Sequence, residues 1–413
     1  MQAVRGTRDI FGEDIIKYNK IIEIARSISR LYNFKEIRVP TIEFSDVFER
    51  NIGETSDIVL KEIYKFKDRS GNDLSLRPEF TAGIVRAILT NPELRDKFPI
   101  RLFSYGSAFR YDRPQKGRYR EFNQINFECF GGGNYLCDFD IIYMANQILK
   151  TLGINNVELE LNSLGCDDSR KKFESSLKIY FKKYENELSD DSKIRLEKNV
   201  LRILDSKDEN DKKLLENAPK ISDFYTIDDK VFLDSIANKL AEYNISFKIN
   251  QNLVRGLDYY TSTVFEFTTN DLGAQSTVFA GGRYDKLMKQ MGGAAIPAFG
   301  CAAGVERLML LIADSIGAIR PIAIVPISDN EINYCINIQN NLRNNDIPCE
   351  IHSEGKMKKK MDNANKISSK FAIIVGEEEV KTNKVKIKNL DIGSESDANL
   401  SEIIKFLKTQ NNE

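Results

Sequence analysis

The chain has 413 residues, with 60 Lys plus Arg against 61 Asp plus Glu, so its formal net charge is −1. This balance argues against a general nucleic-acid coat, because displacing phosphate counterions over a large surface requires a positive excess. Local basic patches are compatible with it. With 41% hydrophobic and 29% charged residues the composition is globular, and it excludes a disordered or collagen-like chain. The length suggests two or three domains.

The sequence contains no stretch near the roughly 18 consecutive apolar residues of a membrane span. The first residues, MQAVRGTRDIFGED, are charged where a signal peptide is apolar. We therefore expect a cytoplasmic protein without membrane contact. The cysteines form no CxxC pair, so neither a zinc cage nor a disulfide framework is indicated. The single histidine, His352, excludes HExxH and other two-histidine metal sites, and a Ser-His-Asp triad could use only that residue.

The N-terminal part begins with a helical pattern and continues with strands. Apolar residues between 14 and 33 recur at three- and four-residue steps, which predicts an amphipathic helix. The following EIRVPTIEF alternates like a strand, and Pro40 marks a sheet edge or a bend. From 74 to 130 short apolar runs alternate with charged turns, and the triple glycine 131–133 ends the segment. VELEL at 157–161 predicts another strand.

The pattern changes over residues 168–243, which are rich in Lys and Glu at helical spacing and poor in glycine. This predicts a helical module inserted between two parts of a sheet domain. Strand patterning returns in ISFKI and STVFEFTT. After Arg320 the runs PIAIVPI, IPCEIH, FAIIVG and KVKIKN alternate with helical segments, which predicts a small, separate α/β domain.

A basic hairpin is the first candidate for binding a ligand. The sequence has no GxxxxGK[ST] or GxGxxG motif, so a nucleotide would have to be held by other means. Residues 101–120 contain six basic side chains and only Asp112 as an acid, with Pro114 and Gly117 as turn signals between two strand-like runs. Guanidinium groups suit phosphate oxygens because they donate two parallel hydrogen bonds and stay charged. A merely solvated hairpin is the alternative.

Further candidates lie in three short segments. LRPEFTAG offers Glu79 and Thr81 for an ammonium group, although an N-capped helix start is the commoner explanation. LVRGLDYYTSTVFEF places Arg255 before Gly256 and an Asp-Tyr-Tyr run, so a cation lies next to aromatic groups that stack and form hydrogen bonds. AAGVERLML is a glycine-to-helix junction with Arg307 near the start of the helix.

Taken together, these segments resemble the class II aminoacyl-tRNA synthetases, and among them the histidyl-tRNA synthetase family, over nearly the whole chain. The helix and strand that end at Pro40 resemble motif 1, FRYDRPQKGRYREF resembles motif 2 and GVERL resembles motif 3. LVRGLDYY and AGGRYD are similar to two blocks peculiar to the histidine-specific family. The combination is specific, whereas any one motif would be weak. The resemblance implies an α+β fold: an antiparallel-sheet catalytic core with a helical insertion and a C-terminal α/β anticodon-binding domain.

The resemblance also implies a division of the chain. Residues 1–167 would form the first part of the catalytic core with motifs 1 and 2, and 168–243 the helical insertion. Residues 244–318 would form the second part of the core, with the histidine-specific blocks and motif 3, and 319–413 the anticodon-binding domain.

The implied enzyme is an ATP-dependent, AMP-forming ligase. It would activate L-histidine to histidyl-adenylate with release of pyrophosphate, and then transfer histidine to the 3' end of tRNA(His). ATP would be a substrate accompanied by Mg²⁺, without a dedicated protein metal site. The resemblance to motif 1 implies a homodimer.

The family's roles for ATP fall on four positions. Arg110 would hold the α-phosphate, Arg118 and Arg307 the outer phosphates, and Phe122 would stack on adenine. Arg255 would lie against the substrate carboxylate and the α-phosphate, where this family uses an arginine in place of a metal. Arg110 and Arg255 would be the catalytic residues, because fixed cations can stabilise the charge that gathers when a carboxylate attacks phosphorus. No protein general base is then required.

The remaining roles concern histidine and tRNA. Glu79, Thr81 and Gln124 would receive the α-amino group, with Arg255 on the carboxylate, and Glu128 and Tyr260 would bind the imidazole. As the bland alternative, Glu128 would only pair with a neighbouring arginine in the sheet. Arg113 and Gln115 would meet the acceptor end of the tRNA.

The sequence departs from the family pattern at three positions and leaves one other reading open. Asp112 replaces the usual Glu, Asn123 a common His, and Asn126 a Gly that leaves room beside the ligand. The alternative function is that of the non-catalytic paralogue that regulates ATP phosphoribosyltransferase. That paralogue usually lacks the C-terminal domain and has eroded histidine-specific blocks. Both are present here, which favours the enzyme.

Overall fold

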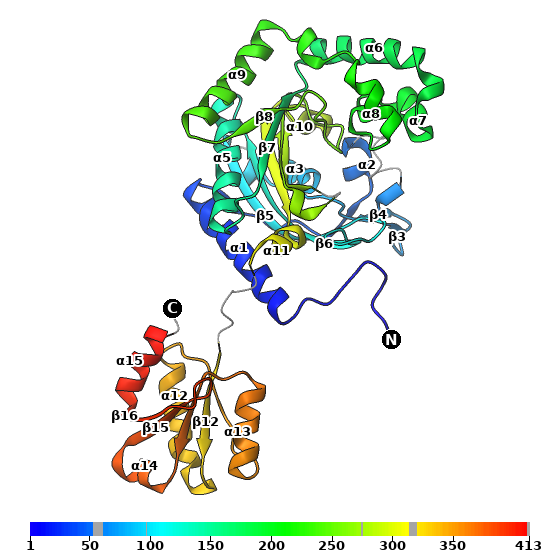
Figure 1. Cartoon of the computed structure of the whole chain (residues 1–413). Coiled ribbons are helices and arrows are strands. Elements are labelled where there is room, and N and C mark those ends of the chain that lie inside the picture. The colour runs from blue at the N-terminus through cyan, green and yellow to red at the C-terminus, as the bar shows by residue number, and fades with distance from the viewer. Residues whose placement is uncertain (53–60, 96, 274–275, 314–319, 411–413) are drawn as a thin grey trace. The chain divides into compact units, whose positions relative to one another are not determined.

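The computed structural model describes residues 1–52, 61–95, 97–273, 276–313 and 320–410. The chain divides into two units, Met1–Asp314 and Ser315–Glu413. Each unit has its own sheet and its own buried core, so we describe each by itself (Figure 1).

The first unit is built on a large, mainly antiparallel sheet with the strand order β1-β5-β6-β11-β10-β9-β7-β8. Parallel pairing occurs where β1 meets β5 and where β7 meets β8. The strands are β1 (Lys35–Glu36), β5 (Ile100–Phe109), β6 (Glu121–Phe130), β7 (Glu158–Ser163), β8 (Phe247–Ile249), β9 (Thr263–Thr268), β10 (Thr277–Arg283) and β11 (Ala298–Gly304).

Helices from the beginning, the middle and the end of the first unit pack against this sheet. Helix α1 contacts β5 and β6, α5 contacts β10 and β11, and α11 contacts β6 and β11. The helices outside the insertion are α1 (Glu13–Leu31), α2 (Asp46–Ile52), α3 (Thr81–Thr90), α4 (Pro92–Arg95), α5 (Tyr135–Thr151), α10 (Leu287–Gln290) and α11 (Val305–Leu311). The predicted helix at 14–33 is α1, whose buried residues recur at helical spacing.

The segment EIRVPTIEF is not the single strand that its alternation predicts. It forms β1 at the edge of the large sheet and then β2 (Ile42–Phe44), which belongs to a small separate sheet of order β2-β4-β3. The other strands of that sheet are β3 (Lys65–Lys67) and β4 (Asp73–Leu76). Pro40 lies between β1 and β2, where its missing N–H and fixed φ suit a bend between two sheets.

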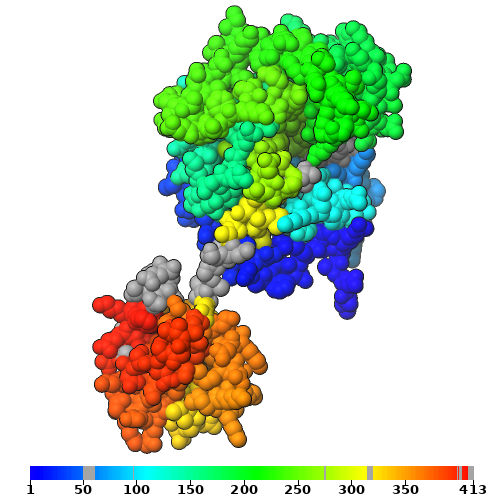
Figure 2. All heavy atoms as spheres, in the orientation of Figure 1, coloured from blue at the N-terminus to red at the C-terminus, as the bar shows by residue number. Residues whose placement is uncertain are grey.

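Between β7 and β8 the chain forms only helices and connecting turns (Figure 1). They are α6 (Asp167–Lys183), α7 (Asp190–Lys198), α8 (Glu209–Glu216), α9 (Ile227–Glu242) and the 3₁₀ turns Glu185–Glu187, Val200–Asp205 and Ile221–Phe224. Side chains cap several of these helices, for example Asp208 at α8 and Thr226 at α9. In Figure 2 this green segment covers one end of the first unit.

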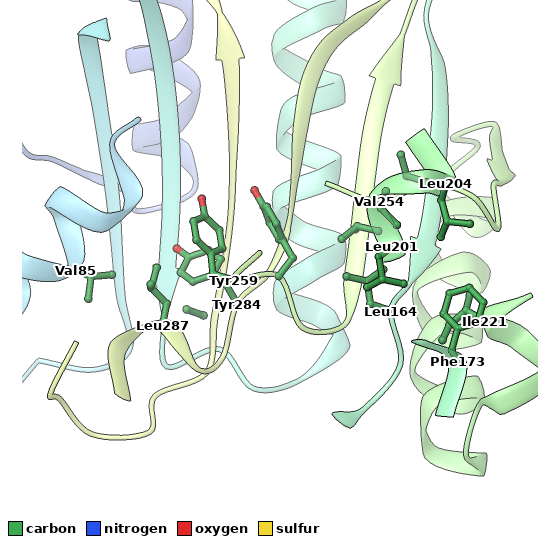
Figure 3. Packing of buried hydrophobic residues seen from close by; sticks show 14 of the residues in the cluster. Val85, Leu164, Phe173, Leu201, Leu204, Ile221, Val254, Tyr259, Tyr284 and Leu287 are labelled. Atoms are coloured by element: carbon green, nitrogen blue, oxygen red, sulfur yellow. The ribbon is translucent and has the colours of Figure 1, made fainter. Parts of the chain in front are cut away.

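The core of these helices continues into the core beside the sheet. One buried cluster includes Phe173 and Ile221 of the helical segment together with Val254, Tyr259 and Tyr284. Figure 3 shows the labelled members of this cluster running from Val85 and Leu287 to Phe173. The helical segment is therefore joined to the sheet by continuous apolar packing.

The second unit has a sheet of order β13-β12-β14-β15-β16. Strands β13, β12 and β14 are parallel, and β15 and β16 are antiparallel to their neighbours. The elements are β12 (Ile322–Pro326), α12 (Ile332–Arg343), β13 (Cys349–Ile351), α13 (Met357–Lys366), β14 (Phe371–Val375), α14 (Glu377–Thr382), β15 (Lys384–Asn389), β16 (Glu395–Asn399) and α15 (Leu400–Gln410). The predicted α/β fold is confirmed, but β16 was not predicted from the sequence because ESDAN has no apolar alternation.

No helix in the described ranges is both long and apolar enough to cross a membrane.

Candidate active site

The large sheet carries a cavity of about 660 Å³. This volume is in the range that holds small-molecule substrates. Twelve site residues were predicted from the sequence, and all except Arg113 and Gln115 line this one cavity. They come from α3, the β5–β6 hairpin, the segment before β9 and α11, which are far apart in the sequence.

The period-two alternation of β6 decides which of its side chains face the cavity. Phe122, Gln124, Asn126 and Glu128 line it. Asn123 points to the other face, where its side chain donates to Glu306 at 2.9 Å and accepts from Tyr18 of α1 at 3.4 Å.

Three arginines form one side of the cavity. Arg110 donates to the Pro78 carbonyl at 2.9 Å, and its guanidinium carbon lies 5.2 Å from the centre of the Phe122 ring. Arg118 pairs with Asp112 in the same hairpin. Arg307 of α11 donates to the Thr277 carbonyl at 2.7 Å.

The electrostatics of these arginines favour an anion. Burial lowers the pKa of Arg110, and burial followed by repulsion from Arg118 and Arg110 lowers the pKa of Arg307 to about 10. Neighbouring cations that disfavour one another's charge would be relieved by a bound polyanion. This side of the cavity is therefore suited to phosphates.

Glu79 and Thr81 are held at the start of α3. The Glu79 carboxylate accepts from the backbone N–H of Thr81 at 2.6 Å and of Ala82 at 2.9 Å, so it caps the helix. The same carboxylate lines the cavity, and burial raises its pKa. The two readings of this segment are compatible, because capping leaves further lone pairs of the carboxylate for a ligand.

Glu128 lines the cavity and is buried, with 2% exposure. It accepts from the Thr81 hydroxyl at 2.6 Å and from the Tyr284 hydroxyl. Burial raises its pKa to about 8, against the lowering effect of these hydrogen bonds. Both of these partners are hydroxyl groups. Among the described residues Glu128 therefore forms no ion pair with a neighbouring arginine, which was the alternative.

Two other polar atoms in the cavity wall have no hydrogen-bond partner within the described part of the chain. They are Oε1 of Gln124 and Nδ2 of Asn126, both buried. A buried polar atom left unpaired costs free energy, so these atoms indicate a bound ligand or water. Asn126, where the family pattern has Gly, thus places a polar amide in the wall.

Arg255 and Tyr260 approach from the segment before β9. Arg255 pairs with Glu266 of β9, and both side chains are largely buried, with 19% and 14% exposure. Its Nε is buried without a partner among the described residues. Tyr260 packs against Tyr259 at 4.8 Å between ring centres, and burial raises its pKa to about 12.

Arg113 and Gln115 lie outside the cavity. Both are exposed in the loop between β5 and β6, where Gln115 forms an isolated bridge with Arg118. The geometry leaves them free to contact a large partner at the mouth of the site.

Sequence reasoning missed Tyr284 and Glu266 as site residues. Tyr284 lies in AGGRYD and Glu266 in the run TVFEF, and both segments had been singled out. The tyrosine in an otherwise small-residue block, and a lone acid in an apolar strand, were the available signals.

Among the described residues, no three His, Cys, Asp or Glu side chains are placed to share a metal ion.

Comparison with known proteins identifies the family of each part of the chain. A family model described as histidyl-tRNA synthetase matches residues 6–308, and one described as anticodon binding domain matches residues 321–410. The chain is 47% identical to the histidine–tRNA ligase of Wolbachia pipientis wMel, over 95% of this chain and 96% of the relative. It is 44% identical to that of Rickettsia bellii, over 99% of both chains.

A solved structure is similar over the same extent. The crystal structure of the apo histidyl-tRNA synthetase of S. aureus has 31% sequence identity and a TM-score of 0.80, and the match covers 98% of this chain and 99% of that chain. The antiparallel sheet, the arginine-lined cavity and the C-terminal α/β unit are those of a class II aminoacyl-tRNA synthetase. Within that class, the chain belongs to the histidyl-tRNA synthetase family.

Proposed function

We propose that the cavity catalyses both steps of the histidine–tRNA ligase reaction. The histidine carboxylate would attack the α-phosphorus of ATP, and the bond to pyrophosphate would break to leave histidyl-adenylate. A hydroxyl at the 3' end of tRNA(His) would then attack the carbonyl carbon and release AMP. The observation that carries the proposal is that one cavity joins an arginine-lined side to a buried carboxylate, Glu128.

The arginine-lined side would bind ATP. Arg110 would contact the α-phosphate, and Arg118 and Arg307 the outer phosphates, because guanidinium groups donate two hydrogen bonds and keep their charge. Phe122 would stack on adenine on one face while Arg110 covers its other face. Mg²⁺ would enter bound to the phosphates of ATP, because in nucleotide sites it usually binds substrate phosphates and water.

The middle of the cavity would hold the α-amino group and the reacting carboxylate. Glu79 supplies a carboxylate, and Gln124 supplies an acceptor oxygen that has no partner among the described residues. Thr81 supplies a hydroxyl oxygen with lone pairs to spare, since its hydrogen goes to Glu128. Arg255 would then face the carboxylate and the α-phosphate as a fixed cation, and preorganised charge of this kind stabilises the transition state.

The buried end would select the imidazole. One ring nitrogen would donate to Glu128 and the other would meet the Tyr260 hydroxyl, a pair of contacts that no other amino-acid side chain provides. A wrong substrate would leave the buried Glu128 with only its hydroxyl partners, Thr81 and Tyr284. Sites built to hydrogen-bond a substrate group reject analogues that lack it by about 10⁴–10⁵. Editing would then be unnecessary.

The second step needs the tRNA. Arg113 and Gln115, exposed on the hairpin, would meet its acceptor end. Asn123 faces away from the cavity, so proton transfer in this step would not involve it. The family match of the second unit supports binding of the anticodon of tRNA(His) there.

We further propose the division into a core of 1–167 and 244–318, an insertion at 168–243 and an anticodon-binding domain at 319–413, in a cytoplasmic enzyme. A homodimer through the segment around β2 is supported by apolar side chains on the small sheet. Ile42, Phe44 and Phe66 are 48%, 59% and 41% exposed. Exposed apolar residues grouped on one sheet mark a surface for a partner.

Amino-acid-dependent ATP–pyrophosphate exchange tests this function. The purified chain should exchange label with histidine and with no other amino acid supplied separately. Exchange with a different amino acid would refute the imidazole pocket. No exchange with any would refute the enzyme and favour a regulatory subunit.

A further inference from the structure

Residues 250–262, between β8 and β9, carry Arg255 and Tyr260 but form neither helix nor strand. Their backbone groups therefore lack the regular hydrogen bonds that hold a side chain in place. Strand β7 and Arg283 bind the two ends of this stretch, and side chains of the helical segment between β7 and β8, called here the insertion, bind the carbonyls of Gly256 and Tyr260.

Arg202, in the 3₁₀ turn Val200–Asp205, binds Gly256, the residue that follows Arg255 in the chain. Arg202 donates to the carbonyl of Gly256, and its Nε lies 3.6 Å from Oδ1 of Asp258. Asn199 donates to the same Oδ1 at 3.0 Å. Two insertion side chains thus hold the backbone and the carboxylate immediately after Arg255.

A third side chain of the insertion binds the other end of the loop. Arg170 of α6 donates to the carbonyl of Tyr260 at 2.7 Å. The insertion therefore binds the loop on both sides of the Leu257–Tyr259 stretch, and each binding point adjoins one of the residues proposed to contact histidine.

These contacts are partly buried and supported by further packing. Arg202 and Asp258 are 12% and 18% exposed, so water screens their attraction only in part. The Arg202 carbonyl is itself bound by Arg195 at 3.3 Å. Leu201 is buried in the same cluster as Val254, and Figure 3 shows the two side chains next to each other.

We propose that Arg202, supported by Asn199 and Arg170, is a positioning residue for Arg255 and Tyr260, so that the insertion is needed for histidine activation itself and not only for contact with tRNA. The inference rests on the proposed function of those two residues. Its physical basis is that catalysis by a fixed cation depends on placement, and a shift of about 1 Å can cost about 10²-fold in rate.

The kinetic test uses the full chain with Arg202→Ala. In histidine-dependent pyrophosphate exchange, kcat/KM for histidine should fall by about 10- to 100-fold, as expected for losing charge-assisted contacts and placement. KM for ATP should change less, because Arg255 is the one residue of this loop proposed to contact ATP, while Arg110 and Arg307 are bound to the carbonyls of Pro78 and Thr277. The matched control is Lys193→Ala on α7. The exposed ammonium of Lys193 forms a surface ion pair with Asp190 at 3.4 Å, and its loss should leave the kinetics as in wild type.

Asp258→Asn should give a similar loss, and the Arg202→Ala/Asp258→Asn double variant should lose less than the product of the two single effects, because both changes break one interaction. Wild-type histidine kinetics in Arg202→Ala would overturn the proposal. So would a loss that is equal in Lys193→Ala, or one that affects histidine and ATP alike.

A second measurement separates this inference from the proposed function. Hydrogen exchange of amides in residues 253–261 should speed up in Arg202→Ala while those in β5 and β6 stay protected. If the wild-type chain showed no histidine-dependent pyrophosphate exchange, the proposed function would fail. The amide hydrogen exchange would still decide whether Arg202 holds the loop. Unchanged amide exchange in this loop would overturn the positioning role.

Discussion

Tyr284 donates its hydroxyl to the carboxylate of Glu128 across β11, the strand that lies between their own regions of the sheet. Glycine in the intervening strand makes this contact possible. Gly300 is the register partner of Glu128, and a Cβ at that position would lie 1.7 Å from Oε2 of Glu128. Gly282 pairs with Gly300 on the next strand, where a Cβ would lie 2.9 Å from the Tyr260 ring. The paired glycines Gly282 and Gly300, of which Gly300 lines the cavity, thus leave room for the side chains of Tyr260 and Glu128.

Gly300→Ala should therefore damage histidine use. The added methyl would displace the Glu128 carboxylate, and a shift of about 1 Å can cost about 10²-fold, so kcat/KM for histidine should fall by about that factor. Steady-state pyrophosphate exchange with varied histidine and varied ATP measures the effect, and KM for ATP should change little. Gly133→Ala is the control, because it lies outside the residues that line the cavity and its Cβ would meet the Pro297 ring at 3.4 Å, an ordinary contact. Equal effects of the two substitutions would show that Gly300 serves only the fold.

Arg255→Ala should slow adenylate formation by removing a fixed positive charge, at a cost of about 2.7–4 kcal/mol by analogy with the loss of one oxyanion donor. The substitution also leaves the largely buried Glu266 without its cationic partner, with only the Thr277 hydroxyl at 2.8 Å, which adds a separate loss of stability. The Arg255→Ala/Glu266→Gln double variant should recover thermal stability but not activity. Single-turnover adenylate formation and thermal unfolding together check this, and recovery of activity in the double variant would rule out a catalytic Arg255.

Glu128→Gln keeps the shape of the side chain but cannot ionise. It should raise KM for histidine while leaving KM for ATP nearly unchanged, because the carboxylate is bound by Thr81 and Tyr284, which are not among the residues proposed to bind ATP. Tyr284→Phe, which removes one hydroxyl that binds Glu128, should move the same parameter in the same direction by less. Impaired ATP binding with unchanged histidine kinetics would instead assign Glu128 to the nucleotide or to the scaffold.

The raised pKa of Glu128 makes stability depend on pH. Burial raises the pKa from its ordinary 4.5 to about 8, so between these values the folded chain holds a proton that the unfolded chain has lost. Stability contributed by this group is then lost as the pH rises, by at most about 1.4 kcal/mol per pH unit. Compared with wild type, Glu128→Gln should gain relative stability from pH 5 to pH 9 in the absence of ligands. Melting curves that shift in parallel for the two proteins would contradict this.

Truncation after Ala318 should separate activation from tRNA charging. The second unit has its own buried core, and its segment 351–388 has ten lysines against five acids. Loss of this unit should leave some histidine-dependent pyrophosphate exchange but raise KM for tRNA, and tRNA binding by the full chain should weaken with salt. Aminoacylation by the truncated chain with an unchanged KM for tRNA would mean that the second unit has another role.

Much of the fold follows from local patterns. The helical spacing of residues 14–33 predicts α1, and the alternation of VELEL predicts β7. The run of strands and helices after Arg320 predicts the α/β unit. These predictions succeed because each depends on residues a few positions apart, whose burial on one face is decided by the period of the element. Alternation failed at EIRVPTIEF, because the two halves of one pattern enter two different sheets.

The chemistry of the site was also present in the sequence as residue types. Arg110, Arg118, Arg255, Arg307 and Glu128 could be chosen from their motifs and from the family resemblance. What the sequence alone determined was therefore the set of side chains and the order of the elements that carry them.

Only the tertiary structure decided how those side chains meet. That Glu128 accepts from Thr81 and Tyr284, and that Asn123 turns away from the cavity, depends on strand register and on the face of β6 that each residue occupies. The hold of Arg202 on the loop after Arg255 depends on the packing of the insertion against the sheet. Such contacts join residues tens to hundreds of positions apart, and no local period encodes them, because a shift of one residue in register would turn every side chain of a strand to the opposite face.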